Sequence, residues 1–137
     1  MNRTTLVDFN ETQKFPIDGV YKVVLIKIDE TPQLLFEKRT YHCNMLENIL
    51  RKKDVPFETK DIGTKHPDLI PLSCGHRYMV IGMGKAEIFK KSKKAVFFGY
   101  SIDYKINMSD SMDVIIPMMH GWNVSHQENY APFKNDD

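Results

Sequence analysis

The stretch V-Y-K-V-V-L-I-K-I, residues 20–28, decides the fold class of this chain. It is rich in β-branched residues and too short for a typical helix, so it predicts a strand. Alternation along a strand divides its side chains between two faces, with Tyr21, Val23 and Leu25 on one and Lys22, Val24 and Ile26 on the other. Lys22 is unusual there, because burying an ammonium group without an anionic partner is costly.

Two later segments have the pattern of helices. In N-M-L-E-N-I-L-R-K-K, residues 44–53, the apolar residues recur at the spacing of one helical face. Its first residue is a candidate N-cap, although the helix could begin slightly earlier. A second helix is expected over residues 109–120, with Ser109 or Asp110 as its cap. Pro117 should kink or end that helix, because proline lacks the backbone N–H that continues it.

The order of strands and helices predicts one α+β or mixed α/β domain, with a helix on each side of the sheet or both helices on one side. Further strands are expected at 77–88, 95–101 and 122–126, with a possible short strand at 33–40 and a hairpin turn at 90–94. The domain should span residues 16–130. Residues 1–15 are predicted to form a flexible arm, 57–76 a long loop or insertion, and 131–137 a tail.

Composition narrows the possible functions. Nineteen basic and 18 acidic residues leave a net charge of +1, which argues against a dedicated nucleic-acid-binding protein. The lysine run at 90–94 is interpreted as a solvated turn; binding of RNA or chromatin there remains the least favoured alternative. There is no apolar run of the roughly 20 residues that span a bilayer, and no signal-peptide core. We therefore expect a cytoplasmic protein without a membrane partner.

The titratable and nucleophilic residues exclude several kinds of site. The five histidines form no pair at metal-ligand spacing, so no metal is expected. Neither cysteine precedes an arginine by six residues: Ile49 follows Cys43 at that distance, and Val80 follows Cys74. A cysteine-phosphatase loop is therefore absent. The G-M-G-K at 82–85 is too short for a nucleotide fingerprint and predicts a bulge or a close backbone approach.

An anion site remains at the start of the first predicted helix, where Tyr41, His42 and Cys43 lie. A helix N-terminus offers N–H groups and the positive end of a macrodipole, both of which suit phosphate. That positive end should lower the pKa of a histidine placed there and keep its ring neutral and basic. The alternatives at this point are a capping or packing role for His42, and a small apolar role for Cys43.

Three segments together resemble the janus/phosphohistidine phosphatase family. They are D-G-V-Y-K-V-V-L-I-K-I at 18–28, Y-H-C-N-M-L at 41–46, and G-M-G-K at 82–85 followed by F-F-G-Y-S-I-D-Y at 97–104. The family pattern runs D-G-x-F-K-Y-V-L-I, Y-H-A-D-I, G-G-G-R-I and V-Y-G-Y-S in the same order. The likeness covers about residues 16–130.

The resemblance implies a small α/β (α+β) domain in which two α-helices flank a mixed β-sheet. It also implies a protein phosphohistidine phosphatase, a hydrolase that cleaves the P–N bond without a metal or other cofactor. It implies His42 as the general base, with a nucleophilic role for the same ring left open. Its expected partners are phosphohistidine-containing proteins, and a monomer is expected. The residues that it implies for binding the phosphoryl group are Lys22, Tyr41, Cys43, Lys85, Ser101 and Asp103.

Three departures from the family pattern motivate an alternative. Lys85 replaces an arginine and so loses the bidentate fork that suits phosphate oxygens. Ile88 replaces a histidine, and Asp103 brings a carboxylate that would repel a phosphoryl dianion. The alternative is a catalytically weak or inactive relative that binds phosphorylated or acidic protein segments.

Overall fold

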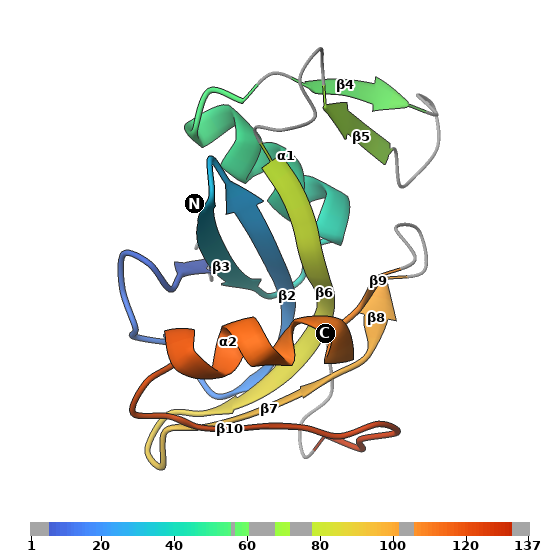
Figure 1. Ribbon diagram of the computed structural model, residues 1–137. Coiled ribbons are helices and arrows are strands. Elements are labelled where there is room, and N and C mark those ends of the chain that lie inside the picture. The colour runs from blue at the N-terminus through green and yellow to red at the C-terminus, as the bar shows by residue number, and fades with distance from the viewer. Residues whose placement is uncertain (1–5, 56, 61–67, 72–77, 102–105, 133–137) are drawn as a thin grey trace.

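The computed structural model describes residues 6–55, 57–60, 68–71, 78–101 and 106–132 (Figure 1). Its elements in chain order are β1 (Val7–Asp8), β2 (Gly19–Ile28), β3 (Thr31–Glu37), α1 (His42–Lys52), β4 (Phe57–Lys60), β5 (Asp68–Pro71), β6 (Tyr78–Phe89), β7 (Lys94–Phe98), β8 (Tyr100–Ser101), β9 (Ile106–Asn107), the 3₁₀ turn η1 (Ser109–Ser111), α2 (Met112–Met118) and β10 (Asn123–His126).

Six strands form the central sheet, in the order β1-β3-β2-β6-β7-β10. Neighbouring strands are antiparallel except for β7 and β10, which run parallel. The expected mixed sheet with two helices in a single α+β domain is therefore confirmed. The strand predicted over residues 20–28 is β2, which pairs with β3 on one side and with β6 on the other.

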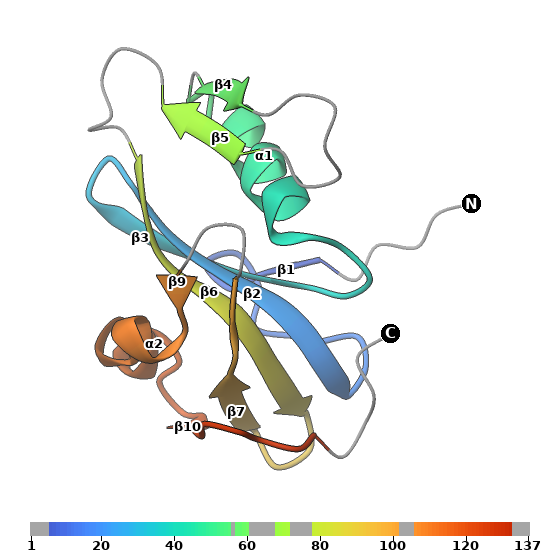
Figure 2. The same ribbon diagram turned by 90° about the vertical axis from the view of Figure 1, so that its right-hand side faces the viewer.

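The two helices cover opposite faces of the sheet, and Figure 1 shows α2 in front of the strands and α1 behind them. Figure 2 shows the same separation from the side. Alternate side chains of β2 enter two hydrophobic clusters, as the sequence predicts. Tyr21, Val23 and Leu25 lie with Met112 and Ile115 of α2, whereas Val24 and Ile26 lie with Met45, Leu46, Ile49 and Leu50 of α1. We call these two sides the α1 face and the α2 face.

The prediction of a loose arm at the N-terminus is wrong for residues 7–15. Val7 pairs with Phe36 of β3, and Val7, Phe9 and Phe15 are buried in the cluster on the α2 face. The ring of Phe15 lies 5.0 Å from that of Phe36, centroid to centroid, in an edge-on arrangement. Three apolar residues scattered among polar ones give no local period, so their burial depends on contacts with distant strands.

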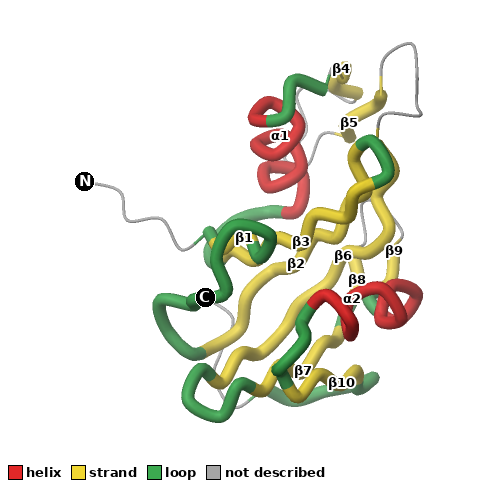
Figure 3. The backbone as a smooth tube through the Cα atoms, turned by 60° about the vertical axis from the view of Figure 1, so that its left-hand side comes forward, coloured by secondary structure: helices red, strands yellow, loops and turns green. Residues whose placement is uncertain are grey.

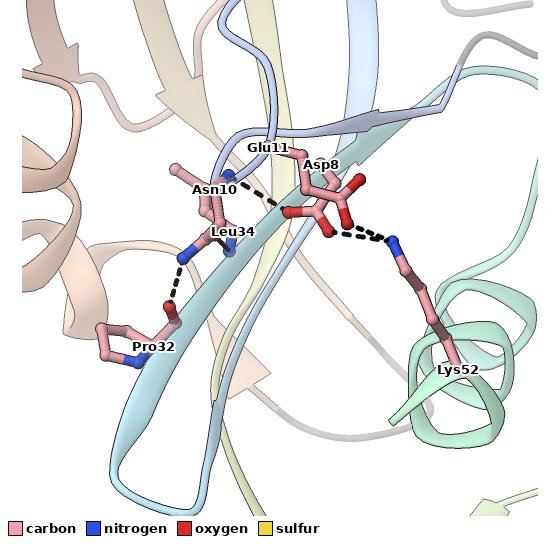
Figure 4. A network of polar contacts seen from close by, with 6 residues as sticks. All are labelled: Asp8, Asn10, Glu11, Pro32, Leu34 and Lys52. Atoms are coloured by element: carbon pink, nitrogen blue, oxygen red, sulfur yellow. Dashed lines mark hydrogen bonds and ion pairs between the residues drawn. The ribbon is translucent and has the colours of Figure 1, made fainter. Parts of the chain in front are cut away.

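Polar contacts also hold this segment to the domain (Figure 4). The side chain of Asn10 donates to the Pro32 carbonyl at 2.8 Å and accepts from the Leu34 N–H at 3.0 Å. Lys52, at the end of α1, contacts Glu11 at 2.6 Å and the buried carboxylate of Asp8 at 3.6 Å. The N-terminal segment is thus tied both to β3 and to α1.

Two further predictions need correction. The loop expected over 57–76 contains β4 and β5, which pair with each other and lie beside α1 (Figure 3). The second helix begins at Met112, after the turn η1, and Ser111 rather than Ser109 or Asp110 precedes its first residue. Pro117 lies in its last turn, in agreement with the prediction that proline ends or kinks it. Within the described ranges, no helix is long and apolar enough to cross a membrane.

Gly82 and Gly84 allow η1 and the residue before it to lie directly against β6. A Cβ at Gly84 would lie 2.8 Å from the Phe98 carbonyl oxygen and 2.9 Å from the Met108 side chain. One at Gly82 would overlap the side chain of Ser111. The glycine pattern is therefore a close backbone approach, and the register of β6 against β2 also shifts by one residue beside Gly82.

Candidate functional site

His42 is the first residue of α1, so the helix starts two residues earlier than Asn44, the candidate N-cap. Its side chain is buried, with 8% of the residue exposed, and its Nε2 lies 2.9 Å from the carbonyl oxygen of Gly84 in β6. A carbonyl oxygen only accepts, so Nε2 carries the hydrogen and donates it. In the neutral ring this leaves the lone pair on Nδ1, which is therefore the nitrogen able to take a proton.

The start of α1 has the properties of an anion-binding helix end. Tyr41 is the N-cap residue, with extended backbone angles (φ −110°, ψ 153°) and no capping hydrogen bond from its side chain. Its carbonyl accepts from the amides of Asn44 at 3.0 Å and Met45 at 3.2 Å. The amides of His42 and Cys43 come before these, where an α-helix supplies no internal acceptor. The first turn holds no acidic residue, so the positive end of the helix is not neutralised by its own sequence.

Lys22 and Lys85 are direct partners across β2 and β6. Both are half-buried, and alternation places both on the α1 face, the face that α1 and His42 cover. Lys85 follows Gly84, whose carbonyl holds the His42 ring. Like charges on paired positions repel each other, so this arrangement favours an anion close to both ammonium groups. The sheet register therefore brings three predicted site residues, His42, Lys22 and Lys85, to one place.

Glu37 is the partner of Lys22 on the opposite side, across β3. It lies on the α1 face, where burial raises the pKa of its carboxyl group above the ordinary value of about 4.5. The raised pKa reflects the free-energy cost of a negative charge at a partly buried position. Across the sheet, Glu37 of β3, Lys22 of β2 and Lys85 of β6 therefore lie side by side. The two ammonium groups, which favour an anion, are on the β2 and β6 side of this row.

The remaining predicted residues are placed as follows. Cys43 is buried beneath the first turn of α1, with its sulfur 3.7 Å from the Asn44 side-chain oxygen, which fits the small apolar role considered for it. Ser101 belongs to β8, beside β6, and its backbone pairs with Ile106. The chain enters β8 through Gly99, whose φ of +80° favours glycine. Asp103 lies outside the described residues.

Sequence reasoning missed a buried acid on the α1 face. Glu87, two residues after Lys85, is fully buried and accepts a hydrogen bond of 2.8 Å from the hydroxyl of Tyr130. Burial, followed by that hydrogen bond, raises the pKa of Tyr130 to about 12. Its ring lies 5.1 Å from that of Phe98, which pairs with Lys85. No local pattern links residues 43 positions apart, so only the fold reveals the contact.

A metal centre has no obvious set of ligands in the described part of the chain. No group of three or more His, Cys, Asp or Glu side chains gathers there in a way that could hold an ion.

Comparison with known proteins gives no further assignment: the chain matches no family model, and no curated protein is significantly similar to it.

Proposed function

We propose that this protein is a metal-independent protein phosphohistidine phosphatase, a divergent relative of the janus/phosphohistidine phosphatase family. The observation that carries the proposal is the meeting of His42 with Gly84 beside the paired lysines Lys22 and Lys85. A neutral imidazole, a helix N-terminus and two cations favour a phosphoryl group more than any other common ligand. The motif resemblance supplies the substrate class.

In the proposed reaction, Nδ1 of His42 removes a proton from a water molecule, and the water oxygen attacks phosphorus. The P–N bond breaks, its electron pair remains on the ring nitrogen of the substrate histidine, and that nitrogen takes a proton from solvent. His42 then releases to solvent the proton that it took from the water, which restores the neutral ring. The products are inorganic phosphate and an unmodified histidine. The Gly84 carbonyl contributes by fixing the hydrogen on Nε2, so that Nδ1 is the basic nitrogen.

Charge on the transferring group is stabilised by groups fixed before the reaction begins. Lys22 and Lys85 project from paired strands, and the amides of the first turn of α1 belong to a helix that packs its other residues into the core. Such preorganised donors need no rearrangement as charge develops on the phosphoryl oxygens. Lys85 acts as a point charge rather than as a bidentate fork.

The test is release of inorganic phosphate from a histidine-phosphorylated peptide by the purified full chain, with excess chelator present throughout. The expected result is catalytic release that the chelator does not change. A phosphoserine peptide of the same sequence serves as the control and should release none, because serine is a much poorer leaving group than imidazole.

The alternative of a non-catalytic binder gives a different result in the same samples. Saturable binding of the phosphohistidine peptide, without any release of phosphate, would replace the phosphatase proposal with the binding one. The substitution of lysine for the family's arginine at position 85 is the observation that keeps this alternative open. Absence of both binding and release would refute both.

A further inference from the structure

A cavity lies beside the site described, at the ends of the parallel strands β7 and β10. Its volume is about 370 Å³, within the size range of ligand pockets. Three segments surround it: the β7–β8 junction, the end of β9 with η1, and the chain after β10. The proposed mechanism uses none of these residues.

The chemistry of the lining selects a cation. Three aromatic rings, one carboxylate and two amides contribute to it, from Phe98, Tyr100, Tyr130, Glu128, Asn107 and Asn129, and Gly99, Ser109 and His126 complete the lining. Among the lining residues that the structure describes, none is lysine or arginine. Aromatic faces and a carboxylate attract a cation, and amide oxygens accept hydrogen bonds from it. The carboxylate of Glu128 would repel an anion in the same place.

One ring of the lining, that of Tyr130, is held in place before any ligand arrives. Tyr130 is fixed at its hydroxyl by Glu87 and at its ring by Phe98. Asn129 adopts a left-handed conformation (φ +55°), which asparagine tolerates, and this turn lets the residues on both sides of it line the cavity. Tyr100 is 57% exposed, a large unburied area for an aromatic side chain. Such a ring offers an open face on which a planar group can stack.

The cavity and the phosphoryl site are neighbours across one strand. Phe98, which lines the cavity, pairs with Lys85, and Lys85 pairs with Lys22. Adjacent strands are roughly 4.8 Å apart, so Phe98 lies about 10 Å from Lys22 along the sheet. An extended peptide advances roughly 3.3 Å per residue, so about two or three residues of a bound peptide would cover that distance.

We propose that this cavity binds an arginine side chain of the substrate protein, about two or three residues from the phosphohistidine. The inference rests on the proposed function, because it identifies the segment that the phosphoryl site would act on. Arginine is preferred to lysine because a planar guanidinium stacks on aromatic rings and pairs with a carboxylate at the same time. The phosphoryl group would then bind beside Lys22 and Lys85, and the guanidinium would bind in the adjacent cavity beside Glu128.

The experiment compares phosphohistidine peptides that differ at one position, with arginine, lysine or glutamine about three residues from the phosphohistidine. The arginine peptide should have a KM about tenfold lower than the glutamine peptide, with lysine between them and kcat unchanged. Glu128→Gln should remove most of that preference. Glu30→Gln, the same chemical change on the exposed β2–β3 turn, should leave it intact. Equal KM values for all three peptides would overturn the proposal.

A binding arm separates failure of this inference from failure of the proposed function. Unphosphorylated versions of the same peptides are titrated into the wild-type chain while the ring resonances of its tyrosines are followed by NMR. Preferential, Glu128-dependent binding of the arginine peptide supports the cavity even if no peptide releases phosphate. Phosphate release with no arginine preference in either arm overturns the cavity and leaves the phosphatase intact. Tyr100→Ala, which alters an exposed ring, provides a second variant that should also lose the preference.

Discussion

Nε2 of His42 lies 2.9 Å from the carbonyl oxygen of Gly84, although 42 residues separate the two in the chain. This contact joins the first turn of α1 to the centre of the sheet. It fixes which ring nitrogen carries the hydrogen, and it sets the imidazole against the backbone of the residue that precedes Lys85, the strand partner of Lys22. Gly84, which has no side chain and so allows the close approach of Met108, thus also supplies the carbonyl that accepts the hydrogen bond of the proposed base.

Gly84→Ala should reduce both stability and phosphatase activity. The added methyl group would lie within 3 Å of the Phe98 carbonyl and of Met108, so β6 or its neighbours must shift. Overpacking of this kind costs about 1–3 kcal/mol of the free energy of unfolding. Gly82→Ala is the control on the same strand, because its added methyl group would crowd the Ser111 side chain of η1, whereas the backbone carbonyl that His42 contacts belongs to Gly84. Denaturant titrations and kcat/KM together decide the matter: equal activity losses in the two variants would contradict the role given to Gly84.

Lys22→Met should lower kcat/KM about a hundredfold, which is typical of losing one group that stabilises the transition state. Methionine keeps most of the length of the side chain and removes its charge, so the variant should still fold. Thermal unfolding and steady-state kinetics measured on the same samples test both halves of the prediction. Activity like that of wild type would exclude Lys22 from the site.

Lys85→Arg should bind the phosphoryl group at least as tightly as wild type, because it restores a guanidinium fork where the chain has a point charge. Lys85→Met provides the contrast and should raise KM. If arginine at this position weakens binding as much as methionine does, the side chain of residue 85 does not face the phosphoryl oxygens.

Glu37→Gln should stabilise the protein at neutral pH but not in acid. Burial raises the pKa of Glu37 in the folded state above about 4.5. The folded state therefore favours the protonated carboxyl group, and stability is lost as the pH rises through the folded-state pKa. Glutamine cannot ionise, so the difference in Tm between variant and wild type should be largest at pH 7 and vanish at acidic pH below about 4. A difference independent of pH would show that ionisation is not its cause.

Lys52→Met should release the N-terminal segment. It leaves the carboxylate of Asp8, whose side chain is 7% exposed, without the nearby cation. The Asn10 amide still donates to one oxygen of that carboxylate, and loss of a partner by a buried polar group costs about 1–3 kcal/mol. Glu11→Gln is the control: its side chain is mostly exposed, so its pair with the same lysine should contribute much less. Faster amide hydrogen exchange in residues 7–15 of the Lys52 variant, compared with the control, is the expected observation.

Local sequence patterns were sufficient to predict the main strands of the central sheet and the first helix. The alternation in residues 20–28 predicted which side chains of β2 enter each cluster, and the four apolar residues of α1 are all buried as their spacing requires. These predictions succeed because the two-residue repeat of a strand and the repeat of about 3.6 residues in a helix are properties of the backbone. Neither repeat depends on distant residues.

The features that local patterns missed all depend on contacts between distant segments. Phe9 and Phe15 are buried because they pack against Phe36 of β3 and against Trp122. The residues next to them in the sequence do not indicate this burial. The pairing of Lys22 with Lys85 follows from the register of β2 and β6, which a bulge beside Gly82 sets. The Tyr130–Glu87 bond likewise joins the end of the described chain to its middle. The sequence indicated which residues to consider, whereas the fold determined which of them meet.

The central claim is that the imidazole of residue 42 performs the chemistry of a phosphoryl-transfer site. Its most direct test is the rate of phosphate release from a phosphohistidine peptide by His42→Ala, alongside His120→Ala, which removes an exposed histidine outside the site. With both variants folded by circular dichroism, we expect kcat to fall at least a hundredfold for residue 42 and to be unchanged for residue 120. A His42 variant that turns over at the wild-type rate would contradict the account.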